Sequence, residues 1–240
     1  MRDMKGKFIV FEGIDGSGKS TQTKMLSQYF ESKGFEVRKI DFPKHGERSS
    51  FLVDDYLNGK YGTAKEVGPY IASVFYACDR YDSSFKMKEW LRQGKIIVAD
   101  RYVTSNIGHQ GGKIKDKEER IKYIKWLCDL EYGLFKIPKP DLNIILKTSP
   151  VISSKLSNVI TDKEKKERRQ SYLKDDTVQD IHEKENSHLK DALEAFLEAK
   201  EVFPNEYEIV ECMDGERLLS KEEIHQKVIL IIDEYEKKHS

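Results

Sequence analysis

A dense run of glycine, lysine and hydroxyl residues lies near the start of the chain, in the stretch FEGIDGSGKSTQ that begins at Phe11. Its fixed positions are Gly13, Gly18, Lys19 and Ser20, which match the spacing GxxxxGKS/T without a gap. Glycines let consecutive backbone N–H groups point into one concavity around a phosphate, and a following helix N-terminus adds partial positive charge. The lysine can reach β- and γ-phosphates, and the serine hydroxyl can ligate Mg²⁺. The stretch therefore predicts a nucleoside triphosphate site.

The loop is expected to bind ATP. The residues expected to contact ATP are Gly13, Gly16, Ser17, Gly18, Lys19, Ser20 and Thr21. GTPases, transport ATPases and small-molecule kinases share such a loop, so the loop alone does not define the reaction. The sequence contains neither the NKxD motif of a GTPase nor an LSGGQ-like transporter signature. These absences disfavour a nucleotide switch and a transporter. A non-catalytic binder is disfavoured because Lys19, Ser20, Asp100 and Arg101 are all present, and a kinase is therefore favoured.

A second group of reactive side chains lies in IIVADRYVTSNIGHQGGK, where Asp100 and Arg101 end an apolar run. In open α/β sheets, ligands bind at the carboxyl ends of the strands. A carboxylate there can hold Mg²⁺ directly or through water, and a guanidinium can neutralise phosphate charge. We expect Ser20 and Asp100 to hold Mg²⁺, and Lys19, Asp100 and Arg101 to be catalytic. The alternative is that Asp100 and Arg101 form a surface ion pair.

Tyr76 and Arg80 lie four residues apart in a long helical pattern and so share one face of that helix. An aromatic ring can stack on a base, and a guanidinium can reach a base carbonyl or a phosphate. The alternative for Tyr76 is ordinary packing in the core.

Short apolar runs that alternate with helical patterns should position these side chains. The expected strands cover residues 7–13, 35–42, 95–101, 142–148 and 207–213. The expected helices cover residues 19–33, 67–93, 116–135, 177–203 and 221–238. Strands that alternate with helices predict an α/β fold, in which helices cover both faces of a parallel sheet. We expect a single domain over residues 1–240.

One segment, about residues 151–176, breaks the alternation. It is polar, strongly basic in its middle and without a clear apolar stripe. Such a segment is either a solvated helix or loop, or a lid that closes over the site.

The composition narrows the class of protein further. Lysine and arginine number 42, as do aspartate and glutamate, so the chain has no overall basic charge for binding nucleic acid. Its three cysteines are far apart and give no zinc spacing, and reduced thiols are expected. No run of eighteen apolar residues is present, so no membrane association is expected. We expect a cytoplasmic protein.

Several motifs together resemble the thymidylate kinase family. These are FEGIDGSGKSTQ, FYACDRY, DRYVTSNIGHQGG, PKPDLNIIL and VECMDGERLLSKEEIHQKV, and they cover nearly the whole chain except residues 151–176. The resemblance implies transfer of the γ-phosphate of ATP to dTMP with Mg²⁺, giving dTDP and ADP. It also implies a three-layer P-loop fold with a five-stranded parallel sheet, and a homodimer. The alternative is a related kinase of another deoxynucleotide or of a deoxynucleoside.

The same resemblance implies residue roles. Tyr76 would stack on the base, Arg80 would lie on the thymine side, and Asp15 would accept a hydrogen bond from the 3′-hydroxyl of dTMP. The residues expected to bind dTMP are Asp15, Phe42, Arg48, Tyr76, Arg80, Arg101, Asn106 and Gln110.

The chain departs from the family pattern at three places: after the FP motif, at His109, and in the lid, which is longer and more basic than the compact version. Some members carry an arginine at the position of Gly16, so here the lid must supply it, and Arg168 and Arg169 are the candidates. The arginine expected after the FP motif is missing, which leaves Lys44, His45 or Arg48 to bind the acceptor phosphate. Arg48 could do so bidentately. His109 stands where a tyrosine near the deoxyribose is common, so sugar discrimination stays open.

Overall fold

The fold is built on one parallel sheet. The computed structural model describes residues 6–158 and 186–239. Within these residues, five parallel strands pair in the order β2-β3-β1-β4-β5. The strands are β1 Lys7–Glu12, β2 Val37–Asp41, β3 Ile96–Asp100, β4 Leu142–Lys147 and β5 Tyr207–Glu211. The predicted fold class is confirmed.

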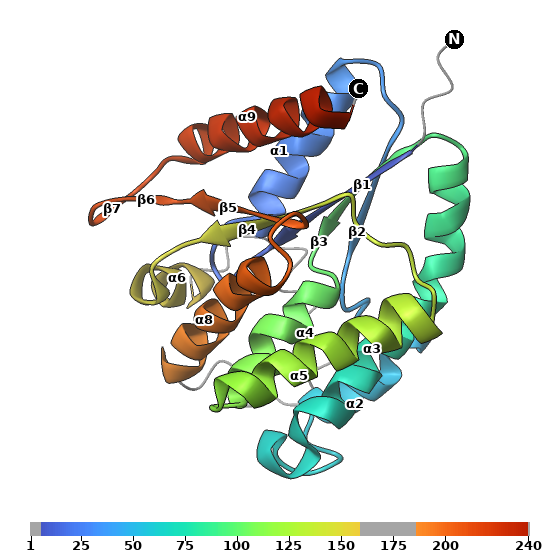
Figure 1. Ribbon diagram of the computed structural model, residues 1–240, viewed down its shortest axis with the longest axis vertical. Coiled ribbons are helices and arrows are strands. Elements are labelled where there is room, and N and C mark those ends of the chain that lie inside the picture. The colour runs from blue at the N-terminus through green and yellow to red at the C-terminus, as the bar shows by residue number, and fades with distance from the viewer. Residues whose placement is uncertain (1–5, 159–185, 240) are drawn as a thin grey trace.

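Helices cover both faces of this sheet. They are α1 Lys19–Ser32, α2 Phe51–Leu57, α3 Ala64–Arg92, α4 Val103–His109, α5 Lys117–Cys128, α6 Pro150–Asn158, α8 Asn186–Val202 and α9 Lys221–His239. Figure 1 shows α1 and α9 on one side of the sheet and α3, α4, α5 and α8 on the other. Smaller elements are the 3-10 turns η1 Arg48–Ser50 and η2 Gly111–Lys113, the π-helical turn η3 Asp129–Leu134, and the hairpin β6 Met213–Asp214 with β7 Arg217–Leu218.

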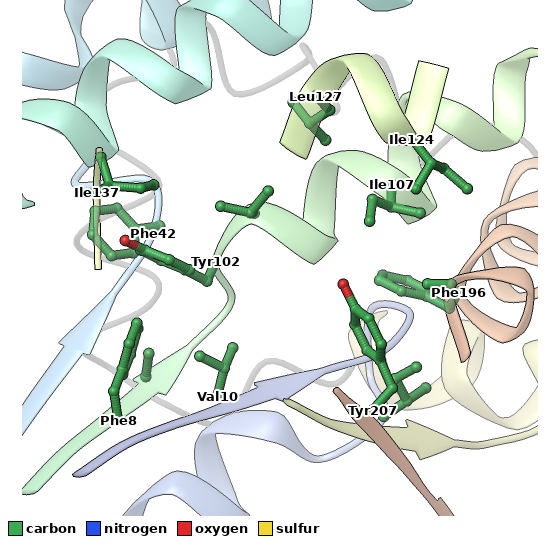
Figure 2. Packing of buried hydrophobic residues seen from close by; sticks show 14 of the residues in the cluster. Phe8, Val10, Phe42, Tyr102, Ile107, Ile124, Leu127, Ile137, Phe196 and Tyr207 are labelled. Carbon is green, nitrogen blue, oxygen red and sulfur yellow. The ribbon is translucent and has the colours of Figure 1, made fainter. Parts of the chain in front are cut away.

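Strand β1 lies at the centre of the sheet and contributes to the core on both faces. Ile9 and Phe11 belong to the cluster beneath α1 and α9, whereas Phe8 and Val10 belong to the opposite cluster. Figure 2 shows Phe8 and Val10 in the same cluster as Phe196 from α8. Because successive strand residues point to opposite faces, a strand that is apolar throughout must be covered on both faces.

Helix α3 starts three residues earlier than predicted. Thr63 caps it: the Thr63 hydroxyl accepts from the Glu66 N–H, and the Glu66 carboxylate accepts from the Thr63 N–H. Gly68 has a φ of 72° and interrupts the helix just before Pro69. The chain therefore makes a capped first turn and a kink before the straight part that carries Tyr76 and Arg80.

Other boundaries differ from the sequence expectations. The helix predicted over 116–135 is divided into α5 and η3. The predicted lid begins with α6, and its residues 159–176 lie outside the described part of the chain. Helices α2 and α4 were not predicted. Each has seven residues, and α4 contains a glycine and three β-branched side chains, so tertiary packing rather than intrinsic propensity stabilises it.

None of the described helices is long and apolar enough to cross a membrane. Cys78, Cys128 and Cys212 are free thiols.

Candidate functional site

The glycine-rich loop connects the end of β1 to the start of α1, as predicted. Gly13 has a φ of 137°, and a side chain there would place its Cβ 2.7 Å from the Leu146 carbonyl oxygen. Gly18 has a φ of 91° directly before α1. Only glycine adopts such angles without strain, so the loop needs these residues to turn tightly onto the helix N-terminus.

Lys19 is buried against this loop. Its Nζ donates to the carbonyl oxygens of Gly13 at 3.0 Å and Ile14 at 2.9 Å. Burial and the positive charge of Arg101 together lower the pKa of Lys19 to about 8, against the opposing negative charges of nearby carboxylates. A bound anion beside this ammonium would favour its charged form, so the loop is suited to a phosphate ligand.

A second loop lies beside the first because β3 pairs with β1 in parallel, with Asp100 opposite Phe11. Arg101, directly after β3, points its guanidinium back to the first loop. Its Nη2 pairs with Asp15, and its Nη1 lies 2.9 Å from His109 Nε2. The predicted residues Asp15, Lys19 and Arg101 therefore meet at the carboxyl ends of two neighbouring strands.

The backbone of Arg101 is unusual. Its φ is 72°, a left-handed conformation that residues with a Cβ adopt rarely. Its N–H donates to the Phe11 carbonyl at 3.0 Å, and the Asp100 carbonyl accepts from the Phe42 N–H at 3.2 Å. The turn is thus tied to β1 and to the segment after β2.

Ser20 and Asp100 are the predicted Mg²⁺ ligands, and both are partly buried. A hydroxyl and a carboxylate supply the oxygen donors that Mg²⁺ prefers. In residues 6–158 and 186–239, no group of three or more histidine, cysteine or acidic side chains could hold a metal ion by itself.

Arg80 is fully buried and makes a two-pronged ion pair with Glu131 of η3. Nε donates to Oε2 at 2.6 Å and Nη2 donates to Oε1 at 2.7 Å. Nη1 is 3.4 Å from the Tyr102 carbonyl oxygen. Tyr76, one turn earlier on α3, is half-buried and packs against the cluster formed by α2 and α3.

The amides predicted to contact the base are held by protein groups. Asn106 Nδ2 donates to the Ser73 carbonyl at 3.2 Å, and Gln110 Oε1 accepts from Lys113 Nζ at 2.7 Å. Both side chains are buried, and their roles toward a base stay predictions. Phe42 is also buried, with its ring against Tyr102, as Figure 2 shows.

The three candidates for the acceptor phosphate lie in one segment after β2. Lys44 Nζ pairs with Glu47 at 2.9 Å, and His45 Nδ1 is 2.5 Å from Asp54. Arg48 is exposed. The lid candidates Arg168 and Arg169 lie outside the described residues.

Two glycines of the run GHQGG are required by helix packing, which sequence reasoning missed. A Cβ on Gly108 would lie 2.3 Å from the Phe196 ring, and one on Gly112 would lie 2.9 Å from the Ala192 backbone N. These glycines allow α8 to approach α4 and η2 closely. His109 consequently stacks on His188 of α8, with ring centroids 5.6 Å apart.

Sequence reasoning also missed the buried carboxylates of Glu12 and Glu131, both 0% exposed. Glu12 carried a signal, because it is the single charged residue at the end of the apolar run FIVFEG. Glu131 carried none, because its partner lies 51 residues away.

Comparisons with known proteins point to one family. A family model described as thymidylate kinase matches residues 11–201. The chain is 33% identical to a probable thymidylate kinase of Pyrococcus horikoshii, over 71% of this chain and 83% of that protein. It is 30% identical to a probable thymidylate kinase of Thermococcus kodakarensis, over 94% and 97% of the two chains. The solved thymidylate kinase of Candida albicans, described as having broad substrate specificity, aligns with a TM-score of 0.68 and 25% identity, over 98% of this chain and 94% of that one.

Proposed function

The chain belongs to the thymidylate kinase family, and from this premise we propose that it transfers the γ-phosphate of ATP to dTMP, giving dTDP and ADP. It is a nucleoside monophosphate kinase, and its substrates are nucleotides. One observation supports the proposal most strongly. Lys19 of the phosphate-binding loop and Arg101 of the neighbouring loop lie at one sheet edge, and Asp15 joins the two loops through its ion pair with Arg101.

The reaction needs positioning and charge compensation more than covalent chemistry. The attacking group is a phosphate oxygen of dTMP, which is ionised at neutral pH, so no strong general base is required. Lys19 supplies positive charge from the donor side and Arg101 from between the two loops. Ser20 and Asp100 would hold Mg²⁺, which when bound neutralises charge on the β- and γ-phosphates.

The remaining positive charge comes from the segment after α6. Gly16 has no side chain to offer, so Arg168 or Arg169 covers the bridging oxygens in this proposal. Closure of that segment would also exclude water, which competes with dTMP as acceptor.

The acceptor is recognised on the side of α3. Tyr76 stacks on the base, and Arg80 presents the Nη1 side of its guanidinium, since Glu131 occupies Nε and Nη2. Asp15 accepts from the 3′-hydroxyl when dTMP is bound, sharing its carboxylate between the sugar and Arg101. Asn106 and Gln110 complete the base edge, Phe42 lies near the monophosphate, and Arg48 binds that phosphate.

The enzyme acts as a homodimer in this proposal. Ile71, Tyr81 and Phe85 are exposed on one face of α3 and recur at a helical spacing. A second copy of the chain would cover this stripe. The cytoplasmic location expected from the sequence stays a prediction.

The function is tested by measuring ADP release with purified protein, ATP and Mg²⁺ against a panel of acceptors. We expect dTMP to be used faster than dUMP, dCMP or thymidine. Lys19→Ala should lower kcat by about 100-fold or more, because it removes a charge from the transferred phosphoryl group. Equal rates for wild type and Lys19→Ala would contradict the kinase, and a clear preference for another acceptor would contradict dTMP as its substrate.

A further inference from the structure

We propose that Glu12 is a positioning residue, which fixes the Asp100–Tyr102 turn and thereby holds Arg101 toward the phosphate-binding loop. The proposal rests on the role given to Arg101 above and adds a residue that does not itself touch a nucleotide.

Three hydrogen bonds join Glu12 to the segment after β3. Oε1 accepts from the Tyr102 N–H at 2.7 Å and from the Ser105 N–H at 3.0 Å, and Oε2 accepts from the Ser105 hydroxyl at 2.6 Å. One backbone donor, Tyr102, directly precedes α4, and the other, Ser105, lies in its first turn. One carboxylate therefore fixes both the exit of the strained turn and the start of the helix that follows it.

The turn needs such a support. Arg101 holds its left-handed φ of 72° only if the surrounding contacts determine it. Its own N–H is bound to Phe11, and the next residue in the chain is bound to Glu12. Since Phe11 and Glu12 are the last residues of β1, the end of the strand that begins the phosphate-binding loop also holds the catalytic arginine.

The burial of Glu12 shows how strongly its carboxylate depends on these hydrogen bonds. The side chain is 0% exposed, and this burial raises its pKa to about 7, against the opposing effects of Ser105, Arg101 and Lys19. A carboxylate is costly to bury unless hydrogen bonds and nearby charge compensate it. Glu12 is near the two cations assigned to the transferred phosphoryl group, and it hydrogen-bonds the segment that carries one of them.

Two variants separate the geometry of Glu12 from its charge. Glu12→Gln keeps the length of the side chain: its carbonyl oxygen can accept from both N–H groups and its amide can donate to the Ser105 hydroxyl. Glu12→Asp keeps the charge but is one methylene too short to reach the same donors. If Glu12 acts by positioning, Glu12→Gln should retain most of the wild-type kcat, whereas Glu12→Asp should lose about 100-fold, as expected for a displaced catalytic group.

The matched control is Asp141→Ala. The Asp141 carboxylate accepts from the Phe8 N–H at 2.7 Å, at the opposite end of the same strand. Its loss should lower stability without changing kcat. All assays are run well below the melting temperature of each variant, and the KM values for ATP and dTMP are measured separately. The KM for ATP should stay near the wild-type value in both Glu12 variants, because the contacts of Lys19 are retained.

The proposal would be overturned if Glu12→Asp kept the wild-type kcat. It would also fail if kcat fell as much in Glu12→Gln as in Glu12→Asp, since positioning alone would then not explain the role of Glu12. An equal fall of kcat in Asp141→Ala would contradict it too, since any loss of a hydrogen bond to β1 would then have the same effect. Amide hydrogen exchange gives a readout that does not depend on the substrate. The Tyr102 and Ser105 N–H groups should exchange faster in Glu12→Asp and as slowly as wild type in Glu12→Gln. Unchanged exchange in Glu12→Asp would defeat the proposal even if dTMP were not the substrate.

Discussion

Arg80 and Glu131 form the most deeply buried ion pair near the acceptor face, with side chains 2% and 0% exposed. Burial disfavours both charges, and their mutual attraction and two hydrogen bonds offset that cost. Burial raises the pKa of Glu131, while Arg80 lowers it. The pair leaves Arg80 rigid, with its Nη1 edge directed toward Tyr102. The arginine is thus fixed in place before any base arrives.

Removing one partner of this pair should lower the free energy of unfolding far more than removing both partners. Glu131→Leu leaves an uncompensated buried guanidinium and should lower the free energy of unfolding by about 3–5 kcal/mol. The double variant Arg80→Met with Glu131→Leu should regain most of that stability but bind dTMP weakly. Chemical denaturation and dTMP titration measure the two effects.

The control is Glu119→Leu on α5, whose carboxylate pairs with the exposed Lys122 and whose loss should cost less than about 1 kcal/mol. If the double variant were as unstable as Glu131→Leu, the uncompensated charge of Arg80 would not be the cause of the lost stability. A double variant with normal dTMP affinity would show that Arg80 does not contact the acceptor.

For individual site residues, sequence reasoning identifies those that belong to a local motif and misses their distant partners. Lys19 and Arg101 lie in short, recognisable patterns beside apolar runs. Glu12 reaches donors 90 and 93 positions away, and Glu131 reaches Arg80 across 51. Which charges meet depends on the packing of strands and helices, and spacing along the chain does not carry that information.

Among the elements, the segment between β2 and α2 is held by carboxylates from two helices. Asp79 of α3 accepts from the Lys44 N–H at 2.8 Å and the Ser49 hydroxyl at 2.6 Å. Asp54 of α2 lies 2.5 Å from His45 and accepts from the Gly46 N–H at 3.1 Å. The segment that carries the candidates for the acceptor phosphate is therefore well anchored.

The contribution of Asp54 should depend on pH. Burial opposes its ionisation, but hydrogen bonds from His45 and Gly46 outweigh burial and lower the pKa of Asp54 below its ordinary value of 3.8. A depressed carboxyl pKa stabilises the fold above 3.8, and this stabilisation is lost as the pH falls through the lower folded value. Asp54→Asn should thus cost about 1–2 kcal/mol near pH 7, and the difference from wild type should shrink below that pKa.

Denaturation midpoints measured from about pH 7 to about pH 3 test this expectation. The matched control is the neighbouring Asp55→Asn, which removes an exposed pair with Lys60 and should change stability little. A difference between wild type and Asp54→Asn that grows in acid would contradict the proposed sign.

Long elements were predictable, and short ones were not. The central strands β1, β3 and β4 are buried over several consecutive residues because both faces of the sheet are covered, and this pattern distinguishes them from helices. Helices α2 and α4 are too short for a periodic pattern. The sequence of α4 forms a helix because Glu12 binds its first turn and α8 packs on Gly108.

For the whole molecule, the exposed stripe on α3 indicates how two copies would meet. Phe85 lies at the end of this stripe and is 60% exposed. Phe85→Glu places a charge in the proposed interface and should convert the dimer to a monomer, with little change in the melting temperature of the single chain. Light scattering coupled to size exclusion measures this. Val151→Glu, which changes an exposed apolar residue of α6, is the control and should stay dimeric. A wild-type monomer, or a Phe85→Glu dimer, would contradict the assignment of this surface.

The central claim is that ATP and dTMP bind at the same sheet edge with their phosphates facing each other across Lys19 and Arg101. A single molecule that joins adenosine and thymidine through a pentaphosphate tests it most directly, by inhibition kinetics against each substrate. The account predicts that this compound competes with both ATP and dTMP, at one molecule per chain. Competition with ATP alone, with dTMP still binding to the inhibited enzyme, would contradict it.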